Sequence, residues 1–117
     1  MPPRTWDFRL RDILDSIELI EGYVRGMTYD QFAADRRTID AVIRNFAIIG
    51  EAANHIPAAL QQRYPSVAWD EMRRMRNFVV HIYFGIDLPT VWRTVQEDLT
   101  PLKAQLAEVL RTAAKDK

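Results

Sequence analysis

The stretch "MRRMRNFVVHIYFG", residues 72–85, has the apolar spacing of a buried helix but contains several polar and charged side chains. At about 100° per residue, its apolar residues gather on one side of a helix: Met72, Met75, Phe78, Val79 and Ile82. This periodicity predicts a helix from about Trp69 to Phe84 that ends at Gly85 and packs that side into a core. Methionines at this spacing are typical of core packing, not of a cofactor site.

Val80 and Phe84 form an apolar strip on the opposite side of this predicted helix. Two polar stripes flank the strip: Arg73, Asn77 and His81 along one edge, and Arg76 with Tyr83 along the other. An apolar strip between polar stripes is typical of a contact surface, and the commonest partner of a small helical protein is a second copy about a twofold axis. We therefore expect a homodimer with Val80 and Phe84 in its interface.

Apolar residues recur at helical spacing along almost the whole chain, and glycine and proline mark where helices end. We expect helices at about Asp7–Arg25 (ended by Gly26), for one or two turns after Thr28, at about Arg37–Asn54, at Pro57–Arg63, and from Pro89 to about Arg111 with a kink at Pro101. The segment "YPSVAWD" is expected to be a loop that Trp69 anchors. The predicted fold class is therefore all-α: an antiparallel bundle of four main helices plus short helices, in one domain of residues 1–117.

The composition narrows the class of protein. Sixteen basic and sixteen acidic side chains give a formal net charge of zero, which argues against a nucleic-acid coat protein but allows a local basic site. Cysteine is absent, so disulfides and thiolate metal sites are excluded. No apolar run approaches the roughly 20 residues of a membrane span, and the N-terminal sequence lacks the apolar core of a signal peptide. We expect a cytoplasmic protein without a membrane segment.

The polar residues near the helix expected at Arg37–Asn54 have ordinary structural explanations. His55 and His81 are the only histidines and lack metal-ligand spacing, so we expect no metal and no cofactor. His55 is expected to cap the carbonyl end of that helix. Arg44 and Glu51, seven residues apart, are expected to form a structural salt bridge, with a supporting role at the groove left open. The small residues of "IGEAA" allow another helix to approach closely.

Arg76 and His81 are the candidate catalytic pair. In most helical proteins such residues belong to the surface or to ion pairs, which is the simpler interpretation. A histidine that titrates near roughly pH 6.5 can nevertheless transfer a proton, and an arginine can hold a phosphate through two hydrogen bonds. Together they suffice for cleavage of RNA by its own 2′-hydroxyl. Five residues apart, they point about 140° away from each other on a helix, so two copies about a twofold axis would bring both pairs to a shared groove.

Neighbouring polar residues suit a phosphate site. Arg73, Arg74 and Arg76 concentrate positive charge in an otherwise neutral chain. We expect Asn77 to orient the histidine or to donate a hydrogen bond to a phosphate oxygen, and Arg73 to bind an RNA phosphate.

The segment "RNFVVHIY" has the pattern Arg-x4-His-x-Tyr and resembles the HepT-like branch of the HEPN superfamily. The flanking segments "YPSVAWDEMRRMRN" and "FGIDLPTVW", and "IGEAANHIP" on the preceding helix, resemble the same branch in the same order. The likeness extends over roughly Asp7–Leu110. One departure is Arg74, where a smaller residue would be expected; the larger side chain can alter the groove width or the substrate preference.

The resemblance implies a metal-independent endoribonuclease, the toxin of a prokaryotic type VII-like toxin–antitoxin pair, that forms a helical homodimer. It implies Arg76 and His81 as the catalytic pair and Asn77 as the polar residue that follows the arginine. It also implies a partner, the minimal nucleotidyltransferase MntA, which silences such toxins by adding AMP to the tyrosine that Tyr83 matches.

Two other functions are weighed against this one. The first is a non-catalytic binding or regulatory subunit of a small nucleotidyltransferase, and the second is a helical dimerisation domain. The intact pair Arg76 and His81 favours the ribonuclease, because a scaffold has no need of both residues.

Overall fold

The computed structural model describes residues 5–78 and 87–113, and every regular element within these ranges is helical. The elements are α1 (Thr5–Val24), α2 (Tyr29–Ala33), α3 (Arg36–Asn54), α4 (Ala58–Arg63), α5 (Trp69–Arg74), α7 (Leu88–Arg93), the π-helical turn η1 (Thr94–Asp98) and α8 (Leu99–Ala113). The all-α class expected from the sequence is confirmed.

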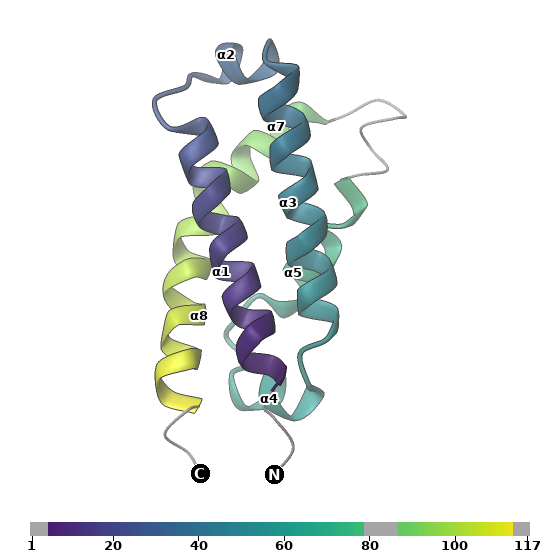
Figure 1. Cartoon of the computed structure of the whole chain (residues 1–117), viewed down its shortest axis with the longest axis vertical. Coiled ribbons are helices and arrows are strands. Elements are labelled where there is room, and N and C mark those ends of the chain that lie inside the picture. Colours follow the sequence, from purple (N-terminus) through teal and green to yellow (C-terminus); the bar gives the residue numbers. More distant parts are fainter. Residues whose placement is uncertain (1–4, 79–86, 114–117) are drawn as a thin grey trace.

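The long helices form an antiparallel bundle (Figure 1). α1 packs along α3, which runs in the opposite direction, and α8 returns along α1, so that α1 starts at the end of the molecule where α8 finishes. α5 packs against α3. α2 and α7 lie at the end of the bundle opposite the start of α1. The bundle architecture expected from the sequence is confirmed.

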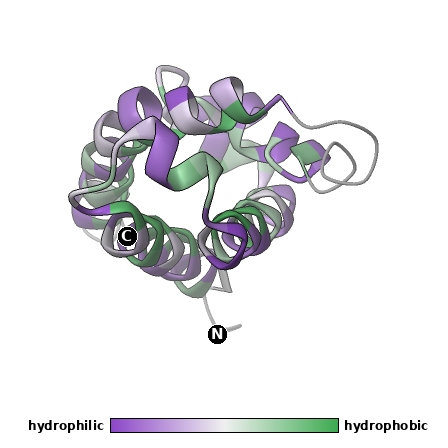
Figure 2. Ribbon diagram, turned by 90° about the horizontal axis from the view of Figure 1, so that it is seen from above, coloured by the Kyte–Doolittle hydropathy of each residue, from purple (hydrophilic) through white to green (hydrophobic). Residues whose placement is uncertain are grey.

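The apolar sides of these helices meet in a common core. Its largest fully buried side chains are Phe32, Phe46, Leu10, Ile13, Ile17, Ile20, Ile49, Met72, Leu99, Leu106, Val42 and Val91. The helices surround this core when the bundle is viewed along its long axis (Figure 2). Met72 and Met75 are buried, and the ring of Phe78 lies 5.1 Å from that of Phe46, so the core side expected for residues 72–78 is confirmed.

Local sequence signals set where the helices start and end. Thr28 starts α2 with a capping box, in which its hydroxyl accepts from the Gln31 amide and the Gln31 side chain accepts from the Thr28 amide. Asp35 caps α3 by accepting from the amide and the hydroxyl of Thr38, and these bonds lower the pKa of its carboxyl below the ordinary value. Gly26 follows α1 with a φ of 77°, a left-handed conformation that glycine adopts without strain.

The loop before α5 is anchored by Trp69, as expected. Its ring is buried, and its Nε1 donates to the carbonyl of Tyr64 at 2.9 Å. The Tyr64 hydroxyl in turn lies 2.7 Å from Oγ1 of Thr112 on α8, so the loop is tied to the C-terminal helix.

The C-terminal helical segment begins with Pro89 in the first turn of α7, as expected. Pro101 lies in the first turn of α8, and the disturbance expected there takes the form of η1, which directly precedes α8. A proline lacks the N–H that would bond to the carbonyl four residues earlier, here Glu97, and its ring crowds that carbonyl. A widened π turn accommodates both effects.

The helix expected from Trp69 to Phe84 is interrupted. α5 ends at Arg74, and Met75 and Arg76 form a turn before helical conformation resumes at Asn77. The Met75 amide bonds to the carbonyl of Met72 at 3.1 Å and the Phe78 amide to that of Met75 at 3.3 Å, so bonds here span three residues instead of four. The prediction of one continuous helix is wrong, and a constant angle per residue does not apply across Arg76.

No helix among the described residues is both long and apolar enough to cross a lipid bilayer.

Candidate functional site

Arg76 lies in the turn after α5, pressed against α3 at Gly50. A Cβ placed on Gly50 would overlap Cγ of Arg76 and would lie 3.0 Å from its backbone nitrogen. Only a residue without a side chain allows this approach, so Gly50 sets both the backbone position and the stem of Arg76. The close packing expected from "IGEAA" is confirmed, and the group that approaches is the candidate catalytic arginine.

The next residue on α3, Glu51, holds the guanidinium of Arg76. Nη1 of Arg76 lies 3.1 Å from Oε2 of Glu51, and both side chains are half exposed. The other oxygen, Oε1, lies 3.1 Å from Nε2 of His55. Exposed ion pairs of this kind add little to stability, about 0–1 kcal/mol. Glu51 therefore orients Arg76 more than it stabilises the fold.

One structural prediction for α3 is wrong. The salt bridge expected between Arg44 and Glu51 does not form, because Glu51 faces Arg76 and His55. His55 caps the carbonyl end of α3 as expected: its backbone N–H donates to the carbonyl of Ala52 at 3.0 Å, and its ring bonds to Glu51. The tertiary contact of α3 with Arg76 changes the pairing that sequence spacing favoured.

Arg76 borders a groove on the outer side of α1 and α3, with a volume of about 400 Å³, which we call the α1–α3 groove. It is lined by Arg9 and Asp12 from α1, by Arg44, Ala47, Ile48, Glu51 and Ala52 from α3, and by Arg76. Three guanidinium groups and two carboxylates thus face one hollow. A phosphate-bearing ligand is the chemistry that such a surface favours.

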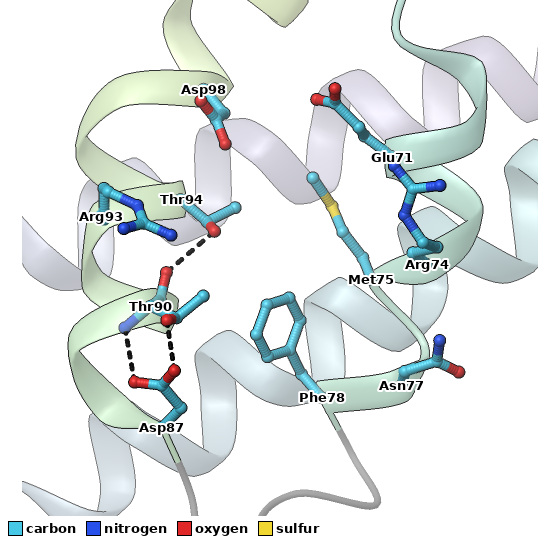
Figure 3. Close-up of a pocket in the computed structure, with 10 residues that line it drawn as sticks. All are labelled: Glu71, Arg74, Met75, Asn77, Phe78, Asp87, Thr90, Arg93, Thr94 and Asp98. Atoms are coloured by element: carbon cyan, nitrogen blue, oxygen red, sulfur yellow. Dashed lines mark hydrogen bonds between the residues drawn. The ribbon is translucent and has the colours of Figure 1, made fainter.

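Arg73 and Asn77 do not join Arg76 at this groove. Arg73 donates to Oε1 of Gln61 at 2.8 Å and pairs with Asp70, and it borders a separate hollow beside α4. Asn77 lines a third hollow, of about 570 Å³, between α5 and the α7–η1 segment. In that hollow Met75 and Phe78 project between the two segments, while Asn77 and Arg74 lie on the α5 side (Figure 3).

This third hollow, the α5–α7 pocket, has a mixed lining. Asp87 starts α7 by accepting from the amide of Thr90, and Thr94 donates to the carbonyl of Thr90 at 2.9 Å (Figure 3). Phe78 and Asp87, the described residues that flank 79–86 in the sequence, both line the pocket.

His81, Tyr83, Val80 and Phe84 all fall within residues 79–86, outside the described residues. The meeting of Arg76 with His81, the position of Tyr83 and the dimer contacts of Val80 and Phe84 stay predictions.

The described residues also contain a site residue that the sequence did not single out, Arg9, and they place beside it Arg44, for which the sequence leaves a supporting role open. Arg9 and Arg44 border the same groove as Arg76, although one lies on α1 and the other on α3. Their proximity follows only from the packing of α1 on α3. Within residues 5–78 and 87–113, no three His, Asp or Glu side chains are grouped closely enough to hold a metal ion.

The family model described as "Ribonuclease HepT-like" matches residues 13–109 of the chain. A protein of Thermococcus cleftensis named "Probable ribonuclease HepT" is 42% identical over 100 residues, which cover 86% of this chain and 91% of that protein. A protein of Methanocaldococcus jannaschii named "Putative RNase" is 32% identical over 111 residues, 95% of this chain and 92% of that protein.

A second M. jannaschii protein, "Gamma-glutamylcyclotransferase and putative RNase", is 38% identical over 108 residues. This match covers 92% of the present chain but only 49% of that relative, so the chain spans about half its length. No solved structure matches the chain significantly.

Replacing a helical glycine by alanine usually raises the free energy of unfolding, but the contact at Gly50 predicts the opposite effect there. Such a change normally stabilises a helix by about 0.5–1 kcal/mol. At Gly50 the new methyl group overlaps Arg76, so we expect Gly50→Ala to lower the free energy of unfolding by about 1–3 kcal/mol, measured by urea denaturation.

Gly22 near the end of α1 is the matched control, because a Cβ there meets nothing within 4 Å. Gly22→Ala should raise the free energy of unfolding or leave it unchanged. If the two variants are stabilised equally, the close approach of Arg76 to α3 does not exist.

Proposed function

This chain belongs to the HepT-like ribonuclease family, and from that premise we propose that it is a metal-independent endoribonuclease of the HEPN type. The observation that supports this most directly is the placement of Arg76, the arginine of the Arg-x4-His-x-Tyr pattern. Gly50 and Glu51 hold its half-exposed guanidinium beside a groove that has two further arginines. The names of the relatives above agree with an activity on RNA.

The proposed reaction is cleavage by the substrate's own 2′-hydroxyl. The 2′-oxygen forms a bond to the adjacent phosphorus while the bond from phosphorus to the 5′-oxygen of the next nucleotide breaks. His81 acts as general base or acid, removing the proton of the 2′-hydroxyl or supplying one to the leaving oxygen. Arg76 donates to the non-bridging oxygens, on which negative charge increases in the transition state. The products are a 2′,3′-cyclic phosphate and a free 5′-hydroxyl.

Asn77 and Arg73 have supporting roles in this proposal. Asn77 follows the catalytic arginine directly but lines the α5–α7 pocket and not the α1–α3 groove, and its proposed task is to orient His81. Arg73 is proposed to bind an RNA phosphate at a distance from the scissile bond. Its bonds to Gln61 and Asp70 would have to loosen for it to do so.

We expect RNA cleavage that depends on Arg76 and His81 and not on metal. Arg76→Ala and His81→Ala should each reduce the cleavage rate by on the order of 10²-fold or more, since each removes one contribution to the transition state. Cleavage of a labelled RNA followed in the presence of EDTA measures the rate, and product mass identifies the cyclic phosphate.

Arg36→Ala is a suitable control, because Arg36 is an exposed arginine of α3 that pairs with Asp40, one turn further along the same helix. This variant should cut RNA at the wild-type rate. Activity that survives His81→Ala, or that EDTA abolishes, contradicts the mechanism. A wild-type protein that binds a nucleotidyltransferase but never cuts RNA would be the non-catalytic subunit instead.

We propose that the protein acts as a homodimer whose interface includes Val80 and Phe84. Light scattering at micromolar concentration should give twice the monomer mass of 13.6 kDa. Phe84→Asp would bury a charge in that interface, cost several kcal/mol of association and yield a monomer. Phe8→Asp makes the same change at an exposed phenylalanine of α1 and should leave the dimer intact. A monomeric wild type would refute this part of the proposal.

We also propose that the protein is the toxin of a toxin–antitoxin pair and that an MntA-like nucleotidyltransferase silences it at Tyr83. The phenolic oxygen of Tyr83 would bond to the α-phosphorus of ATP and release pyrophosphate. The added AMP brings negative charge and bulk close to Arg76 in sequence, where an RNA phosphate has to bind.

Tyr83→Phe should keep most of the ribonuclease activity and escape silencing by the nucleotidyltransferase and ATP. Intact-mass spectrometry should show AMP-sized additions on the wild type and none on this variant. Tyr23→Phe, at an exposed tyrosine of α1, should be modified and silenced like the wild type. Equal modification of the wild type and Tyr83→Phe would exclude Tyr83 as the acceptor.

A further inference from the structure

We infer that the α1–α3 groove binds the sugar–phosphate backbone of single-stranded RNA beside the bond that is cut, with Arg9 and Arg44 as phosphate-binding side chains. The inference rests on the proposed ribonuclease function, because it assigns the substrate path next to Arg76. The sequence pattern does not mark Arg9 and does not bring it together with Arg44, since the two are 35 positions apart in the chain.

The charge balance of the groove supports an anionic ligand. Of its two carboxylates, Glu51 is already shared between Arg76 and His55, which leaves Asp12 to face Arg9 and Arg44. Neither Arg9 nor Arg44 forms a hydrogen bond or an ion pair with another side chain of the described residues. Their guanidinium groups are therefore available to a phosphate, which arginine holds through paired hydrogen bonds.

The two arginines are mounted on rigid elements. Arg9 directly precedes Leu10, which is fully buried, and Arg44 directly follows Ile43, which is also buried. The packing of α1 on α3 thus fixes the distance between their backbones before any ligand binds. A surface positioned in this way loses little conformational freedom on binding.

The groove also offers small and apolar surface between its charges. Ala47 and Ala52 leave room along α3, and Ile48 is 37% exposed beside them.

A second copy of the chain fits this face less well than RNA does. Packing about a twofold axis brings the same patch of both copies together, so the interface would contain six guanidinium groups and only four carboxylates, an excess of positive charge. Like charges placed opposite each other in an interface cost several kcal/mol. The phosphates of RNA have the complementary charge.

The test is the binding of a fluorescent 2′-O-methyl oligonucleotide, which has no 2′-hydroxyl and so cannot be cut by the proposed reaction. Fluorescence anisotropy over a range of salt concentrations gives the affinity and its salt dependence. Arg9→Gln and Arg44→Gln should each weaken binding several-fold at low salt. Each should also reduce the slope of log K against log salt by about 0.7, the value for one lost phosphate contact on a single strand.

Arg11→Gln is the matched control. It removes the same charge from an exposed residue of α1 that is two positions from Arg9 and therefore on a different side of the helix. Its affinity and salt slope should stay close to those of the wild type. Arg9→Lys and Arg44→Lys keep the charge, so they should retain most of the salt slope, and unchanged thermal melting of all variants shows that the fold is intact.

Equal losses for Arg9→Gln, Arg44→Gln and Arg11→Gln would overturn the inference, because they would show a general charge effect. Unchanged RNA binding combined with loss of the dimer in the first two variants would also overturn it and would identify the groove as an interface between copies. Binding that depends on Arg9 and Arg44 in a protein that cuts no RNA would uphold the groove and refute the proposed catalysis.

Discussion

The contact of Arg76 with α3 over Gly50 is the constraint on which the candidate site depends. The missing side chain at Gly50 lets the turn after α5 lie directly on α3, with the stem of Arg76 in the space that a Cβ would occupy. Glu51, the next residue, then receives the guanidinium. One position of α3 provides the space and its neighbour provides the charge, so a small shift of α3 against α5 would disturb both.

The charges of the protein are arranged more unevenly than a net charge of zero suggests. Several exposed arginines are neutralised by carboxylates one turn away, as Arg36 is by Asp40 and Arg111 by Glu108. At the α1–α3 groove the pairing is incomplete, because Glu51 serves Arg76 and His55 while Arg9 and Arg44 have no partner among the described residues. A neutral protein can therefore still present a local surface suited to phosphate.

Interruptions of regular helix geometry decide which residues share a surface. Arg76, in the turn after α5, borders the α1–α3 groove, while Asn77, the next residue, lines the α5–α7 pocket. A regular helix would instead have placed Arg73 and Asn77 on one stripe. The two line separate hollows, so positions on a helical wheel misplace side chains wherever hydrogen bonds change from four-residue to three-residue spacing.

The sequence by itself determined the all-α bundle, the approximate bounds of α1 and α3, and the anchor at Trp69. It also determined the membership of a ribonuclease family. Periodicity, helix-breaking residues and short motifs are local properties of the chain, so they can be recognised without the tertiary structure. The tertiary structure alone decided that α5 stops at Arg74, that Glu51 pairs with Arg76 instead of Arg44, and that Arg9 joins the groove. These features depend on which helix lies against which, and a side chain's partner across two helices has no fixed spacing along the chain. The physical reason is that van der Waals overlap and ion pairing act through space, between atoms that only packing brings together.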